Sequence, residues 1–105
     1  MEATQTLEKA EIILQQLGGK GRLTAMIGAH TFVGAPGGSV QFRFRAKAKD
    51  GINFVRVSLQ SDDTYRLEML RLSGINSWHK ADIAGLHAGD LRRIIENRTG
   101  LYLSL

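Results

Sequence analysis

The chain has 105 residues, of which 43% are hydrophobic and 23% charged, and its formal net charge is +4 at pH 7. This composition argues against disorder, and the length predicts a single domain spanning residues 1–105. The absence of cysteine excludes disulfides and thiolate metal sites. No apolar run approaches the roughly 20 residues that span a bilayer, so we expect a cytoplasmic protein without a membrane partner.

The N-terminal third predicts a helix, a strand and a loop. Apolar residues at helical spacing indicate a helix from about residue 7 to 17, ended by Gly18 and Gly19. The mostly apolar segment 22–29 predicts a strand that is buried on both faces. Residues 30–39 contain the only proline and three glycines, which predicts a mobile loop of the kind that often carries function.

The segment 40–49 alternates apolar and polar residues, which predicts a strand with one buried face. The buried face would carry Val40, Phe42, Phe44, Ala46 and Ala48, and the other face Arg43, Arg45, Lys47 and Lys49. Asp50-Gly51 then predicts a turn.

Three further strands and a second helix follow. The strands are expected at 52–59, at 64–72 and, as a short element, at 75–81. The helix is expected from about Leu86 to Arg98, with Gly100 as its C-cap and an apolar tail that packs back onto the domain. The order predicts an α+β fold, an antiparallel four- or five-stranded meander with an N-terminal and a C-terminal helix packed on one face.

A basic sheet face is the leading candidate site. With Val55 and Val57 facing the helices, alternation places Phe54 and the cations of three strands on the opposite face. The candidate nucleic-acid-binding residues are Arg43, Arg45, Lys47, Lys49, Phe54, Arg56 and Arg66. Arginine and lysine neutralise phosphates, and an exposed phenylalanine can stack on an unpaired base. The alternative is a solvated strand face whose charges discourage aggregation.

The other motifs indicate a functional site less strongly. Gly18–Arg22 resembles a phosphate loop, but Gly21 follows Lys20 where Ser or Thr is required, and no strand precedes it. The three histidines, His30, His79 and His87, are interpreted as unrelated surface or loop residues rather than as a metal site with Asp82. No nucleophile with its base is recognisable, so we expect no catalytic residues, no cofactor and no enzyme activity. Trp78 is expected to pack locally near the second helix, with a homodimer contact as the alternative.

The chain resembles small uncharacterised proteins encoded by bacteriophages and other mobile elements. The matching segments are Leu17–Gly19, Ala25–Ala29, Gly51–Val57 and Thr99–Leu103. The resemblance implies a bacterial or phage cytoplasm and a small accessory role, and it assigns no functional residue. It leaves two hypotheses open: binding of the DNA or RNA backbone through the basic face, or a non-enzymatic inhibitor or adaptor that docks on a host protein, with the loop 30–39 giving specificity.

Overall fold

The computed structural model describes residues 2–35 and 37–103, with side chains from Lys9 onward. Within these residues, three α-helices, one 3₁₀ turn and five strands follow one another. Their bounds are α1 Glu2–Gln16, α2 Lys20–Ile27, β1 His30–Ala35, β2 Ser39–Arg43, η1 Lys49–Gly51, β3 Phe54–Leu59, β4 Tyr65–Ser73, β5 Asn76–Leu86 and α3 Ala88–Thr99. None of the described helices is long and apolar enough to cross a membrane.

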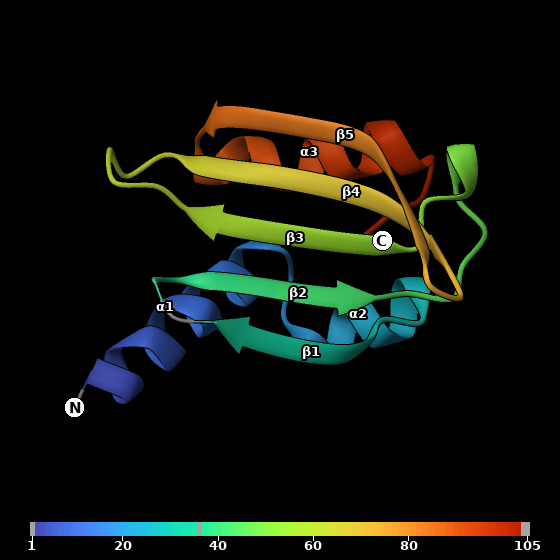
Figure 1. The fold of residues 1–105 in the computed structure, drawn as a ribbon. Coiled ribbons are helices and arrows are strands. Elements are labelled where there is room, and N and C mark those ends of the chain that lie inside the picture. Colours follow the sequence, from blue (N-terminus) through green and yellow to red (C-terminus); the bar gives the residue numbers. More distant parts are fainter. Residues whose placement is uncertain (1, 36, 104–105) are drawn as a thin grey trace.

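The five strands form one antiparallel sheet in the order β1-β2-β3-β4-β5, so each strand pairs with its neighbour in sequence. All the helices lie behind this sheet in Figure 1, which leaves its front face uncovered. Helix α1 packs against β1, β2 and α3. This confirms the predicted α+β meander with helices on one face.

The core lies between the sheet and the helices. Val40, Phe42, Val55 and Val57 point into it, and the pairing of Phe42 with Val55 and of Val40 with Val57 puts them on one face. The predicted phase of β2 and β3 is therefore confirmed. The opposite wall consists of helix residues and of Leu17, which directly follows α1: Ile13, Leu14, Leu17, Leu23, Ile27, Leu91 and Ile95. The side chain of Leu7, predicted to join this stripe, lies outside the described residues.

The strand predicted at 22–29 is wrong, because this segment forms helix α2. Its buried residues are Leu23 and Ile27, which lie one helical turn apart, while Thr24 and Ala25 between them are exposed. Gly28 follows with φ of 68°, a left-handed conformation in which a glycine C-cap is favoured. The short apolar run thus follows the helical period rather than that of a doubly buried strand.

The loop predicted at 30–39 is also wrong over most of its length. Residues 30–35 form the edge strand β1, which pairs with β2 and places the ring of Phe32 5.3 Å from that of Phe42. The turn to β2 contains Gly37 and Gly38 with φ near 88° and 86°. The glycines serve this tight hairpin, and the proline of the segment lies outside the described residues.

The basic strand is shorter than predicted, since β2 ends at Arg43 rather than at Lys49. Beyond Phe44, the backbone N–H groups of Arg45 and Ala46 both donate to the carbonyl oxygen of Ile27, at 3.2 and 3.1 Å. That carbonyl belongs to the last turn of α2, where helix acceptors lack partners of their own. The chain therefore leaves the sheet at this point and returns to it at Phe54.

In the C-terminal half, the observed elements are closer to those predicted from the sequence. Strand β4 buries Tyr65, Leu67 and Met69 as predicted, while β5 extends to Leu86 and is longer than the predicted strand 75–81. Helix α3 begins at Ala88 and ends at Thr99, and the φ of 75° at Gly100 confirms the predicted C-cap. The tail packs back through Leu103, which is fully buried.

Candidate nucleic-acid interface

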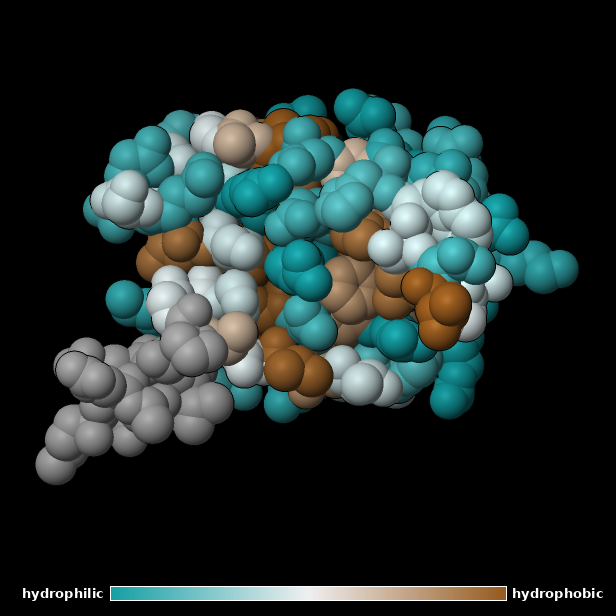
Figure 2. All heavy atoms as spheres, viewed as in Figure 1, coloured by the Kyte–Doolittle hydropathy of each residue, from teal (hydrophilic) through white to brown (hydrophobic). Residues whose placement is uncertain are grey.

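The uncovered face of the sheet, here called the open face, carries fewer of the predicted cations than expected. Register places Arg43, Arg56 and Arg66 on it, together with Glu68 and Asp82. Three cations and two carboxylates leave a formal charge of 3 − 2 = +1. Hydrophilic side chains spread across this face in Figure 2, with hydrophobic side chains showing between them.

Two of the three cations on the open face are engaged by those carboxylates. Arg66 donates two hydrogen bonds to Asp82, at 2.8 and 2.6 Å, and they hold the pKa of the Asp82 carboxyl below its ordinary value. Arg56 lies 3.5 Å from Glu68, which also contacts His79 at 3.3 Å. Glu68 is almost wholly buried, and Arg56 is the cation that compensates its charge. The middle of the open face is thus largely self-neutralised.

Phe54 does not offer the stacking surface that was predicted. It lies on the open face, opposite Arg43 and Leu70, but only 6% of it is exposed. The guanidinium of Arg56 lies 5.4 Å from the ring centroid and covers part of the ring. A base has no free ring face of Phe54 on which to stack.

Four of the predicted cations, together with Arg71, gather at one end of the sheet, where β2 and β4 finish and β3 begins. We call this cluster the basic end: Arg43, Arg45, Lys47, Lys49 and Arg71. Asp50 is the only acidic residue between Arg43 and Asn53 in the sequence. Within residues 9–35 and 37–103, none of the five cations forms an ion pair with a carboxylate. Their charges are available to an anion from solvent.

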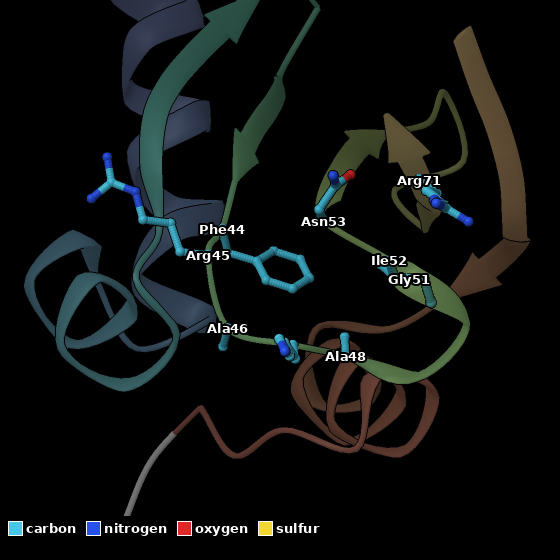
Figure 3. Close-up of a pocket in the computed structure, with 9 residues that line it drawn as sticks. Phe44, Arg45, Ala46, Ala48, Gly51, Ile52, Asn53 and Arg71 are labelled. Carbon is cyan, nitrogen blue, oxygen red and sulfur yellow. The ribbon is translucent and has the colours of Figure 1, made fainter. Parts of the chain in front are cut away.

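A pocket of about 520 Å³ opens at this end, lined by residues 44–48, residues 51–53 and Arg71. Figure 3 shows the ring of Phe44 facing its centre, whereas the guanidinium groups of Arg45 and Arg71 point outward on opposite sides. The amide of Asn53 is held by the backbone of Leu72: its nitrogen donates to the carbonyl oxygen at 2.9 Å, and its oxygen accepts from the N–H group at 2.7 Å. The pocket therefore has an apolar floor and a cationic rim.

Arg71 was missed in the sequence, although one signal pointed to it. It follows Tyr65, Leu67 and Met69 at a period of two and so belongs to the apolar face of β4. A cation at that position marks where the core ends. It fits there beside Gly51, because a Cβ at that glycine would stand only 3.0 Å from the Cδ of Arg71.

The other sequence motifs give no candidate site in the described part of the chain. No group of three or more His, Asp or Glu side chains able to hold a metal is found there. Helix α2 starts at Lys20, so a helix does follow the glycines, but a helix rather than a strand precedes them. Lys20 itself contacts Glu11 at 3.8 Å and the ring of Phe32 at 5.7 Å. Gly18–Arg22 was interpreted as a helix C-cap and turn, which holds only for Gly18 and Gly19 between α1 and α2, because Lys20–Arg22 already belong to α2.

Comparison with protein-family models, with curated proteins and with solved structures finds no match to this chain. The resemblance to proteins of phages and mobile elements therefore stays a prediction.

Proposed function

We propose that this protein is a small, non-enzymatic accessory protein of a phage or mobile element that binds the backbone of nucleic acid in the cytoplasm. The basic end makes the contact in place of the sheet face expected from the sequence. The observation that supports this is a group of five cations without carboxylate partners among the described residues, three of which, Arg45, Lys47 and Arg71, line one pocket. Lysine and arginine in such numbers neutralise phosphates largely without regard to base sequence.

The size of the electrostatic effect follows from the number of cations. If all five contact phosphates, the affinity for single strands should fall with a log–log salt slope of about −3.5, from about −0.7 per phosphate. Arg56 and Arg66 add little, because Glu68 and Asp82 already engage them. A slope close to that value would indicate that the basic end carries most of the binding.

Two charge-matched double variants test the assignment of the surface. R45Q/K47Q and R56Q/R66Q each remove two positive charges and lower the formal net charge from +4 to +2. Anisotropy of labelled oligonucleotides, titrated at several salt concentrations, gives affinity and slope for each. We expect R45Q/K47Q to reduce the slope by about 1.4 and R56Q/R66Q to leave it unchanged.

The comparison of the two variants also decides whether the basic end or the open face binds the nucleic acid. A loss confined to R56Q/R66Q would return the binding site to the open face. Absence of binding at low salt in the unmodified protein would refute the proposal.

The second candidate is an inhibitor or adaptor that docks on an acidic host protein. It is favoured by the apolar side chains near the basic end, since Ile75 at the β4–β5 turn is fully exposed and Trp78 is 44% exposed. Under this hypothesis one host protein should co-purify with the chain, and nuclease treatment should not release it.

A further inference from the structure

Trp78 offers an exposed aromatic surface beside the basic end. It lies near the start of the edge strand β5 and pairs with Arg71 of β4. The guanidinium of Arg71 lies 5.4 Å from the centroid of the indole ring, within the range of a cation–π contact. The residue nevertheless keeps 44% of its surface exposed and does not belong to the core cluster.

Arg71 connects this ring to the pocket. The same side chain lines the pocket together with Phe44, Arg45 and Lys47, and its head points outward from it in Figure 3. The aromatic surface therefore adjoins the rim of the pocket at Arg71. Phosphates on the rim would bring their own bases within reach of the indole.

We propose that Trp78 stacks on an unpaired base while the basic end contacts the flanking phosphates, so that single-stranded nucleic acid is the preferred ligand. This inference rests on the proposed function and narrows it. In a duplex the bases are stacked on one another and only the phosphates are accessible, whereas single strands present free base faces to aromatic side chains. Trp78 thus takes the role that the sequence suggested for the buried Phe54.

The test compares three polyanions on the full chain: oligothymidylate, a duplex of the same length, and inorganic polyphosphate. Trp78 is the only tryptophan, so intrinsic fluorescence reports on it alone. We expect saturable quenching by oligothymidylate and little by the duplex or polyphosphate. Anisotropy should show W78A losing about tenfold in affinity for oligothymidylate, as expected for one lost base stack, and nothing for the other two ligands.

Two further variants complete the design. W78F keeps a stacking ring and should restore most of the affinity, and Y102A removes another exposed aromatic residue, 74% accessible, as the matched control. Circular dichroism of each variant checks the fold.

Three outcomes are distinguishable. A loss of affinity that occurs only in W78A and only for oligothymidylate supports the inference. Binding of oligothymidylate without quenching, and unchanged in W78A, overturns it while the proposed function stands. Failure to bind any of the three ligands overturns both.

Discussion

Replacing Phe42 by Ala should remove a large part of the stability of the domain. The side chain is 1% exposed and lies in the middle of the core between the ring of Phe32 and the paired Val55. Removal of a buried phenylalanine costs about 3–5 kcal/mol. A chain of 105 residues has a free energy of unfolding of about 5–15 kcal/mol, so the variant should lose from roughly a fifth to all of it.

The assay is urea unfolding followed by far-ultraviolet circular dichroism. Ile75→Ala is the matched control, because this apolar residue is fully exposed and its removal should change the free energy of unfolding by no more than about 0.5 kcal/mol. If F42A does not fold, F42L is the milder variant and should lower the free energy of unfolding by about 1 kcal/mol. Equal stability of F42A and I75A would refute the placement of Phe42 in the core.

A double-mutant cycle extends the experiment to the edge strand β1. The rings of Phe32 and Phe42 are 5.3 Å apart and tilted by 35°, a geometry for which the coupling free energy is about 0.5–1.5 kcal/mol. The cycle is best run as F32L, F42L and the double variant, all of which should fold. A coupling of zero would indicate that the segment around Phe32 is the mobile loop that the sequence suggested.

Two further predictions concern backbone conformation and pH. Gly89→Ala within helix α3 should raise the free energy of unfolding by about 0.5–1 kcal/mol, since no atom lies near the added Cβ, whereas Gly100→Ala at φ of 75° should lower it by about 1 kcal/mol, both measured by urea unfolding. Hydrogen bonds lower the pKa of three carboxyls below the usual 3.8, so their contribution to stability is present above that pH and should be lost as the pH falls below it. They are Asp62, Asp82 and Asp90, and replacing all three with Asn should flatten the melting temperature between pH 2 and 5.

The local hydrophobic pattern was sufficient to predict an element where its apolar residues keep one period along its whole length. The alternation around Phe42, Val55 and Leu67 predicted both the strands and the face that each buries, because those strands cover a helical layer on one side only. Helix α2 was missed because the mostly apolar run of eight residues at 22–29 fits both the period of a helix and that of a strand. Gly28 directly after Ile27 was the signal for a helix C-cap.

The site could be predicted only in part, because its geometry depends on contacts between distant segments. The divergence of the chain at Arg45 comes from hydrogen bonds to Ile27 in another element, which no local alternation reveals. The neutralisation of Arg56 by Glu68 requires the register between β3 and β4. The sequence therefore indicated which cations the chain possesses but not which of them face an ion partner.

The contact between α1 and α3 has a consequence for how the chain assembles. Each strand pairs with the next in sequence, so the sheet can grow hairpin by hairpin with little cost in loop closure. The two helices that meet behind it are the first and the last elements, and the inner face is fully covered only when both are in place. During synthesis on the ribosome, folding should therefore reach completion only after α3 has emerged, when the two ends of the chain close over the core together.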